Sequence, residues 1–172
     1  MLRTPVLGDF EAWAELRQAS RHFLVPWEPM WSAQEFSRFS FRARIKHYQQ
    51  QIKDDASYPF FIFHGEHGHL LGAITISNVR RGVAQMGSVG YWIGERFAHQ
   101  GYMSEALAAI VAHAYGELAL HRIEAACLPA NVASIGLLQR CGFVQEGLAR
   151  LYLQIAGVWQ DHLLFARIAV QK

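Results

Sequence analysis

The sequence predicts a mixed α/β fold, in which one central sheet contains both parallel and antiparallel strands and is flanked by helices. Two segments near the start have apolar residues three or four positions apart, which is helical spacing. From residue 58 the chain is typical of a strand hairpin, and a second hairpin ends the chain. Between the hairpins, strands alternate with helices, and a strand–helix–strand connection makes parallel neighbours. This order predicts a mixed sheet and not a doubly wound parallel one.

Length and composition predict one domain over residues 1–172. A chain of 172 residues has the usual size of a single domain. Hydrophobic residues make up 52% of it and charged residues 17%, so the chain can bury enough apolar surface to exclude disorder. The low charge also predicts that a ligand cleft or a partner covers part of the surface. A net charge of +2 excludes the strongly basic pattern of sequence-specific nucleic-acid-binding proteins.

Cysteines, apolar runs and the N-terminus predict a cytoplasmic protein with no metal site and no membrane span. Cys127 and Cys141 lack the spacing of metal ligands and are expected to be reduced thiols. The best charge-free stretch, Ala125–Gln139, is shorter than the ~20 residues that a membrane helix needs. The N-terminus also lacks the apolar region of a signal peptide. The histidines His64, His67 and His69 cluster at the expected hairpin turn, and an exposed turn is favoured there over a metal site, because no carboxylate–histidine set repeats the pattern elsewhere in the chain.

The N-terminal part of the chain is expected to form two helices. The first begins with Asp9 as N-cap and ends before Phe23–Trp31, where two prolines forbid regular helix. A capping box from Ser32 to Glu35 opens the second, which runs toward Lys53. Its opposite face is expected to be solvated, with an acidic partner as the alternative. The apolar faces carry Phe10, Trp13 and Leu16, then Phe41, Ile45, Tyr48 and Ile52, and the basic face carries Arg38, Arg42, Arg44, Lys46 and Lys53.

The remaining segments supply strands and two further helices. Alternating residues predict the strands, and alanine- and leucine-rich segments predict the helices. Gly142 is the expected C′ glycine of the second of these helices, and Ala156-Gly157 is the expected tight turn of the last hairpin. The predicted order is strands Tyr58–His64, Leu70–Asn78 and Ser88–Gly94, a helix over 103–118, strand Arg122–Cys127, a helix ending at Gly142, and strands Phe143–Ile155 and Val158–Ile168.

A strand, a short polar loop and a strong helix follow one another between Gly90 and Leu107. Gly101 lies in the loop, and the helix after it presents free backbone N–H groups and the positive end of its dipole. This pattern predicts an anion site, with an ordinary glycine turn as the alternative. It is neither a Walker loop nor a Rossmann fingerprint, because the lysine and the glycine spacings of those motifs are missing.

Glu124, Asn131 and Ser134 are the other candidate site residues. Glu124 lies within a short apolar strand, where a carboxylate costs free energy unless it is paired or has a functional role, so it is a candidate general base. The alternative is an ion pair with an arginine such as Arg122. Asn131 is most simply a helix N-cap, and Ser134 is either a proton donor or a hydroxyl of the capping region.

Several short motifs together resemble the acetyl-CoA-binding core of the GNAT superfamily of N-acetyltransferases. The chain is similar in particular to ribosomal-protein-alanine N-acetyltransferases of the RimJ/RimL type, and the resemblance spans essentially its whole length. The motifs that carry it are Gly90-Tyr-Trp-Ile, Gly101-Tyr-Met-Ser-Glu-Ala-Leu107, His121-Arg-Ile-Glu124, Pro129-Ala-Asn131, Ala133-Ser134, Cys141-Gly-Phe143 and Gly157-Val-Trp-Gln-Asp-His162, with Arg3-Thr-Pro, Asp9-Phe-Glu-Ala-Trp13 and Phe23-Leu-Val-Pro-Trp-Glu-Pro29 at the front.

This resemblance implies a GNAT fold in which strand Tyr91–Gly94 splays from Arg122–Cys127 and the pantetheine arm of acetyl-CoA lies between them. A backbone N–H near Ile93 then holds the thioester oxygen. Asn131 contacts the pantetheine or a water, and Ser134 hydrogen-bonds the sulfur and protonates the leaving thiolate. The implied coenzyme-binding residues are Trp92, Ile93, Gly94, His99, Gln100, Gly101, Tyr102, Met103, Ser104, Asn131 and Ser134, of which His99 to Ser104 cradle the pyrophosphate.

The sequence departs from the family pattern at the phosphate loop and at the acid. Of the three usual loop positions, only Gly101 conforms, because positions 98 and 103 are Ala and Met. The tyrosine acid of many members is replaced by Leu138, which leaves Ser134 as the local acid. Glu124 lies two residues from the glutamate that is the base in some relatives, on the same strand face, and Glu105 is a second candidate.

The implied reaction transfers acetyl from acetyl-CoA to a primary amine, the N-terminal α-amino group of a protein such as a ribosomal protein with alanine or serine first. A small-molecule amine, such as a polyamine or an antibiotic, is the alternative acceptor, and a non-catalytic acyl-CoA-binding module is the alternative function. The first helices and the loop through Trp27 and Trp31 form the acceptor side. The resemblance implies no metal and no membrane partner, and it leaves a homodimer open.

Overall fold

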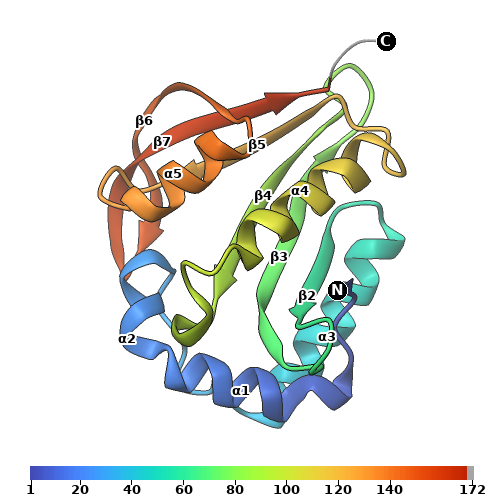
Figure 1. Cartoon of the computed structure of the whole chain (residues 1–172), viewed down its shortest axis with the longest axis vertical. Coiled ribbons are helices and arrows are strands. Elements are labelled where there is room, and N and C mark those ends of the chain that lie inside the picture. The colour runs from blue at the N-terminus through green and yellow to red at the C-terminus, as the bar shows by residue number, and fades with distance from the viewer. Residues whose placement is uncertain (170–172) are drawn as a thin grey trace.

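A seven-stranded mixed sheet forms the centre of the molecule, with strand order β1-β2-β3-β4-β5-β7-β6 (Figure 1). The structure is a computed structural model that describes residues 1–169. Its strands are β1 (Leu2–Arg3), β2 (Tyr58–Phe63), β3 (Leu70–Arg80), β4 (Met86–Ile93), β5 (Arg122–Cys127), β6 (Val144–Ile155) and β7 (Val158–Ile168). Its α-helices are α1 (Phe10–Ala19), α2 (Arg21–Leu24), α3 (Arg38–Lys53), α4 (Tyr102–Tyr115) and α5 (Val132–Arg140), and its 3₁₀ turns are η1 (Leu7–Asp9), η2 (Val25–Trp27) and η3 (Glu95–Phe97).

The predicted fold class is confirmed, because β4 and β5 pair in parallel while every other pair of neighbouring strands is antiparallel. The turn at Ala156-Gly157 also forms where it was expected, with φ values of 49° and 83°. Those values are typical of the turn that best matches the twist of a hairpin. The short β1, which pairs with β2, has no counterpart in the sequence prediction.

The N-terminal helices differ from the prediction in where they begin and end. The carboxylate of Asp9 does not cap α1; it accepts hydrogen bonds from Arg3 and from the backbone N–H of Val6. Helical structure continues past Phe23 through α2 and η2, because Pro26 lies at the start of a 3₁₀ turn, where no N–H is needed.

The predicted capping box at residues 32–35 is wrong. The second helix begins five residues later, at Arg38, and its N-cap is Ser37, whose side chain accepts from the N–H of Ser40. Glu35 instead forms an ion pair with Arg44, at 2.7 Å. The predicted apolar stripe of this helix is confirmed, because Phe41 and Ile45 are buried.

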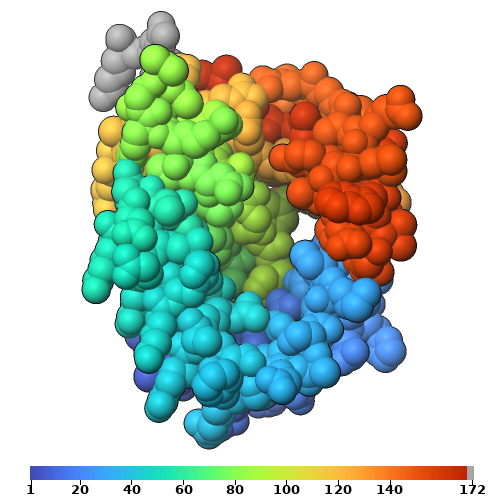
Figure 2. All heavy atoms as spheres, turned by 180° about the vertical axis from the view of Figure 1, so that it is seen from behind, coloured from blue at the N-terminus to red at the C-terminus, as the bar shows by residue number. Residues whose placement is uncertain are grey.

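Each face of the sheet has its own hydrophobic core. On one face α4 and α5 pack over β3, β4 and β5, around fully buried residues such as Leu107 and Ile123. On the other face α1 and α3 pack over β2 and β3, around Trp13 and Phe41, whose ring centroids are 5.0 Å apart. Figures 1 and 2 show these two faces. Among residues 1–169, no helix is long and apolar enough to cross a membrane.

The centre of the sheet opens, as predicted. β4 and β5 pair only from Met86–Ser88 to Arg122–Glu124, and beyond these residues the two strands separate. Seen from behind in Figure 2, the molecule is hollowed between the orange-red β6–β7 hairpin and the blue N-terminal helices. The sheet therefore has an opening between β4 and β5 that connects its two faces.

Candidate active site

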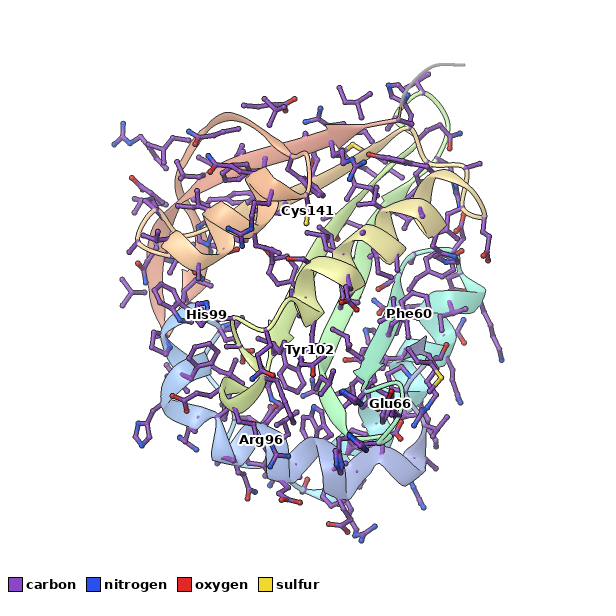
Figure 3. All side chains as sticks on the ribbon, in the orientation of Figure 1. Phe60, Glu66, Arg96, His99, Tyr102 and Cys141 are labelled. Carbon is purple, nitrogen blue, oxygen red and sulfur yellow. The ribbon has the colours of Figure 1, made fainter. Side chains whose placement is uncertain are left out.

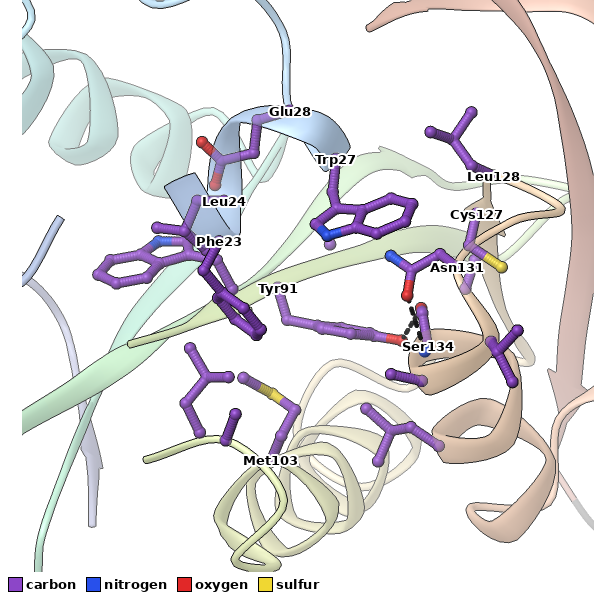
Figure 4. A pocket seen from close by; sticks show the side chains of 18 of the residues that line it. Phe23, Leu24, Trp27, Glu28, Tyr91, Met103, Cys127, Leu128, Asn131 and Ser134 are labelled. Carbon is purple, nitrogen blue, oxygen red and sulfur yellow. Dashed lines mark hydrogen bonds between the residues drawn. The ribbon is translucent and has the colours of Figure 1, made fainter. Parts of the chain in front are cut away.

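A cavity of about 820 Å³ lies where β4 and β5 separate. Its walls come from the end of β4, the loop before α4, the end of β5, the first turn of α5, the segment around α2 and η2, and the β6–β7 hairpin. In Figure 4, Phe23 and Trp27 extend from the N-terminal segment toward the space beside Tyr91, and Met103 approaches from α4. The cavity is thus built by all the elements that border the opening in the sheet.

The loop before α4 presents backbone N–H groups to this cavity. Gly101 immediately precedes the helix with φ of 88°, and His99 also has a positive φ, of 59°. The first hydrogen bond of the helix runs from the N–H of Glu105 to the carbonyl of Gly101, so the preceding N–H groups remain free for a ligand. With the helix dipole behind them, they form a cradle for an anion such as a phosphate.

Side chains hold this loop on both sides. The amide of Gln100 donates to the carbonyl of Arg96 at 2.8 Å. The ring of Tyr102 lies edge-on to His64 of the β2–β3 turn, with centroids 5.7 Å apart, whereas His99 extends toward α2 (Figure 3). The loop shape is therefore set by contacts that do not use its free N–H groups.

The open edge of β4 offers a second set of hydrogen-bonding groups. The N–H of Gly94 donates to the carbonyl of Leu71, at 2.8 Å, so it points toward β3. Because successive N–H groups of a strand point to opposite sides, the N–H of Ile93 points toward the space between β4 and β5. This N–H can therefore donate a hydrogen bond to the carbonyl oxygen of an extended ligand that lies along β4.

Ser134, Tyr91 and Asn131 meet at the first turn of α5 (Figure 4). The Tyr91 hydroxyl and the Ser134 Oγ are 2.8 Å apart, and Asn131 Oδ1 accepts from the backbone N–H of Ser134 at 3.0 Å. Asn131 is thus the N-cap, as predicted. Burial raises the pKa of Tyr91 to about 12, although its hydrogen bond with Ser134 acts in the opposite direction. The phenol is therefore protonated at neutral pH and can donate to the serine hydroxyl.

Sequence reasoning missed Tyr91 as a partner of Ser134. Alternation along β4 places Tyr91 on the same face as Val89 and Ile93, which pack toward α4. The alternation indicates this face, but Ser134 lies 43 positions further along the chain, and only the packing of α5 brings the two hydroxyls together. Nearby, burial raises the pKa of the Cys127 thiol, which keeps it protonated.

Most residues that the resemblance implies for coenzyme binding line the cavity, but Gly94 does not. The N–H of Gly94 is used by β3, and a Cβ at this position would lie 2.4 Å from Leu16 of α1. Its role is therefore to let α1 approach the end of β4. The residues from the implied set that do line the cavity are Trp92, Ile93, His99, Gln100, Gly101, Tyr102, Met103, Ser104, Asn131 and Ser134.

Neither candidate carboxylate base lies in this cavity. Glu124 accepts a hydrogen bond from Arg122 at 2.9 Å, at the closed end of the opening where β4 and β5 still pair. Arg122 in turn reaches Glu146, and these two partners raise its pKa. Glu105 is exposed on α4. For Glu124 the structure thus matches the alternative reading, an ion pair with Arg122.

A second cavity, of about 420 Å³, lies on the α1–α3 face and shares Glu28, Gly90, Tyr91 and Trp92 with the first. Glu28 accepts from Arg17 at 2.5 Å and from the indole N–H of Trp31 at 2.7 Å. Trp27 lines the first cavity and Trp31 the second. The two cavities therefore meet at the opening in the sheet, so that ligands can approach it from both faces.

In the described part of the chain, residues 1–169, no group of three or more His, Cys, Asp or Glu side chains is placed to hold a metal ion. The turn histidines instead stack on one another, with the ring centroids of His64 and His67 4.8 Å apart. The chemistry that the site offers is an anion cradle, a row of strand hydrogen-bonding groups and a pair of hydroxyls.

Comparisons with known proteins agree with this geometry. The family described as acetyltransferase (GNAT) domain matches residues 1–144. The ribosomal protein uS5-alanine N-acetyltransferase of Escherichia coli is 36% identical over 163 residues, which are 94% of this chain and 84% of that protein. The structure of Mycobacterium smegmatis RimJ in complex with CoA-disulfide superimposes with a TM-score of 0.93 at 34% identity, covering 98% of this chain and 81% of that chain. The ribosomal-protein-S5-alanine acetyltransferase of Vibrio fischeri gives a TM-score of 0.90 at 30% identity, with coverage of 97% and 91%.

Proposed function

From the premise that this chain belongs to the GNAT acetyltransferase family, we propose that it acetylates the N-terminal α-amino group of a protein, such as a ribosomal protein that begins with alanine or serine. The chain is an acetyl-CoA-dependent N-acetyltransferase, and similar proteins bear the names of ribosomal-protein acetyltransferases. Such an acceptor is made in the cytoplasm, the compartment that the sequence predicts.

The observation that carries this proposal is the pair of cavities that meet at the opening in the sheet. In the proposed arrangement acetyl-CoA enters the larger one, with its pyrophosphate on the loop from His99 to Ser104 and its pantetheine arm along β4. The smaller cavity then receives the acceptor from the α1–α3 face. A flexible chain end is narrow enough for such an entrance, and its backbone can meet the polar and aromatic side chains that line it.

In the proposed reaction the acceptor amine attacks the carbonyl carbon of the thioester. The N–H of Ile93 stabilises the negative charge that develops on the carbonyl oxygen. When the C–S bond breaks, the Ser134 hydroxyl donates its proton to the leaving thiolate. Because Tyr91 is hydrogen-bonded to the same hydroxyl, it keeps the Ser134 proton directed toward the sulfur and stabilises the serine oxygen as the proton leaves.

An α-amino acceptor fits the acid–base groups of this site better than a lysine side chain does. With a pKa of ~7.7–8.0, roughly a third of α-amino groups are neutral at pH 7.5, compared with about one in a thousand lysines. Since the candidate carboxylates lie outside the cavity, a substrate that is easily deprotonated needs the least help from the protein. Positioning and oxyanion stabilisation then account for most of the rate enhancement.

Incubation with acetyl-CoA and short peptides tests this proposal. Peptides that begin with Ala, Ser, Thr or Met are compared with the same peptides carrying a blocked N-terminus and one internal lysine, and with spermidine. We expect mass spectrometry to find one acetyl group, at the free N-terminus only. Acetylation of spermidine alone would replace the proposed acceptor by a small amine, and coenzyme binding without any thiol release would favour a non-catalytic binding module.

A further inference from the structure

His162 is a buried histidine that the reaction described above does not use. It lies on β7, is only 2% exposed, and lines the larger cavity. Burying a polar side chain costs free energy unless it is hydrogen-bonded, so the contacts of both ring nitrogens matter.

The hydrogen bond of one ring nitrogen fixes the tautomer of His162. Its Nδ1 lies 3.0 Å from the backbone carbonyl oxygen of Gln160. A carbonyl oxygen can only accept, so Nδ1 must carry a proton, and in the neutral ring Nε2 must then carry a lone pair. Within residues 1–169 Nε2 has no hydrogen-bond partner, and it is not among the buried side-chain atoms shut off from solvent. The lone pair is therefore open to the cavity.

The strand register shows on which face of the sheet His162 lies. Leu164 pairs with Ala126 of β5, and paired residues point their side chains to the same face. Leu163 and Cys127, their neighbours, face the core under α4 and α5. Ala126, Leu164 and His162 therefore face the opposite side. His162 thus approaches the cavity from the face of the proposed acceptor entrance, whereas Ser134 approaches it from α5.

The other titratable groups around this part of the cavity are paired, protonated or outside the cavity lining. Glu28, from the N-terminal segment, is paired with Arg17 and Trp31. Cys127, from β5, points to the opposite face of the sheet, and burial raises its pKa, so that the thiol stays protonated. Tyr152, from β6, is exposed and does not line the cavity; its ring lies edge-on to His162 with centroids 6.0 Å apart.

The groups further along the cavity do not offer a base on the acceptor side either. Tyr91 is a donor whose pKa is raised to about 12. Arg140 has no lone pair to accept a proton. His99 and Tyr102 belong to the loop that cradles the anion. Glu35, which lines the smaller cavity, is paired with Arg44 at 2.7 Å, as Glu28 is with Arg17. Among the described residues on the acceptor side, His162 is therefore the group whose lone pair is not taken by an ion pair.

The geometry points to His162 as the general base that deprotonates the acceptor amine. Nε2 takes one proton from the acceptor ammonium group and becomes part of an imidazolium. The neutral amine then forms the new C–N bond, the C–S bond breaks, and Ser134 gives its proton to the thiolate. The second proton lost by the amine nitrogen restores the Ser134 hydroxyl, and the imidazolium releases its proton to solvent. The inference rests on acetyl transfer but not on the identity of the acceptor.

Replacement of His162 tests the inference, with whichever acceptor the wild-type protein acetylates, an Ala-initiated peptide or spermidine. We expect His162→Gln to lower kcat by on the order of 100-fold at pH 7, since general base catalysis contributes at least that much. The dissociation constant for acetyl-CoA and the melting temperature should stay close to wild type. With the peptide, the deficit should shrink toward pH 9, where the α-amine is already neutral. His47→Gln, on the exposed face of α3, is the matched control and should behave as wild type.

Added imidazole separates a base from a structural role. It should restore kcat to His162→Ala in a saturable manner but leave His162→Gln unchanged, because only the smaller side chain leaves room for it. A kcat of His162→Gln within threefold of wild type, or an equal loss at every pH, would overturn the inference.

If neither variant folds, ¹⁵N spectra of the wild-type protein still test the inference. They should show His162 with the proton on Nδ1 at pH 7.5, and a proton on Nε2 instead would overturn it. If no acceptor is acetylated, the proposed function fails, and the same spectra report on His162 independently.

Discussion

Replacing Ser134 by alanine removes the proposed acid and leaves the rest of the site in place. The N-cap of α5 survives, because Asn131 accepts a hydrogen bond from the backbone N–H of Ser134 and not from its side chain. The coenzyme cradle also survives, because the loop before α4 is held by other contacts. The variant therefore isolates one hydroxyl, which lies 2.8 Å from that of Tyr91.

The expected loss is in turnover. A general acid typically contributes about 100-fold or more to the rate, so kcat should fall by at least about 100-fold. This fall corresponds to a loss of about 2.7 kcal/mol of transition-state stabilisation. Stability should change by only about 1 kcal/mol, because the cavity gives water access to the unpaired Tyr91 hydroxyl. The dissociation constant for acetyl-CoA should stay within about threefold of wild type, since the proposed pyrophosphate site consists of backbone groups.

Thiol release at saturating acetyl-CoA and acceptor measures kcat, and calorimetry measures coenzyme binding. Ser134→Thr keeps the hydroxyl and should retain most of the activity. Tyr91→Phe removes the partner and should lower kcat by less than Ser134→Ala, and the double variant should be no worse than Ser134→Ala, because both changes act on one proton transfer. An unchanged kcat in Ser134→Ala, or a loss that appears wholly in coenzyme binding, would refute the assigned acid.

Three further changes probe other parts of the molecule. Gly101→Ala should weaken acetyl-CoA binding measured by calorimetry. A Cβ at this position would meet no atom, but a residue with a side chain adopts φ of 88° only at a cost of about 1 kcal/mol or more, so the loop should change shape. Unchanged affinity would argue against the cradle. Glu124→Gln should keep kcat within about threefold in the thiol assay, because Glu124 lies outside the cavity; a 100-fold loss would make it the base. Asp55→Asn should be less stable than wild type at pH 7 by about 0.5 kcal/mol in urea unfolding, a figure discounted for exposure. Hydrogen bonds from Arg81 and then Tyr58 lower the pKa of Asp55 from 3.8 to about 2, so the carboxylate stabilises the folded protein fully above pH 4. The difference in stability between wild type and Asp55→Asn should therefore vanish as the pH falls toward 2. A difference that stays constant with pH would contradict this cause.

Local patterns were sufficient to predict most of the fold. The stripe of Phe41 and Ile45 predicts which face of α3 is buried, and strand Arg122–Cys127 is predicted with its observed bounds. The errors occur where a side chain finds a distant partner that the sequence does not reveal. Glu35 has the spacing of a capping box, but in the folded chain its carboxylate pairs with Arg44, and the helix begins later, at Arg38, with Ser37 as its N-cap.

The candidate site could be predicted in part for the same reason. Gly101 and Asn131 depend on their own backbone surroundings, so their neighbours in sequence are enough to identify the N-cap and to propose the anion cradle. The role of Glu124 depends on Arg122 and on where β4 and β5 part, and only the strand register settles that. Gly94 likewise depends on a contact with Leu16 of α1, far away in sequence.

The position of Tyr91 also depends on contacts between distant parts of the chain. The family pattern expects a tyrosine where this chain has Leu138, and Leu138 is 1% exposed in the core between α5 and the sheet. A phenol at that position would have to enter a packed core, whereas Tyr91 reaches Ser134 from β4 across the cavity. The chain therefore still places a tyrosine hydroxyl beside the proposed acid, but it comes from the strand and not from the helix. In the proposed arrangement the serine exchanges a proton with the thiolate, and the tyrosine, whose phenol burial keeps protonated, donates to the serine oxygen and positions it. That division assigns different losses to Ser134→Ala and Tyr91→Phe, which is why the pair of variants tests the arrangement more strictly than either one alone.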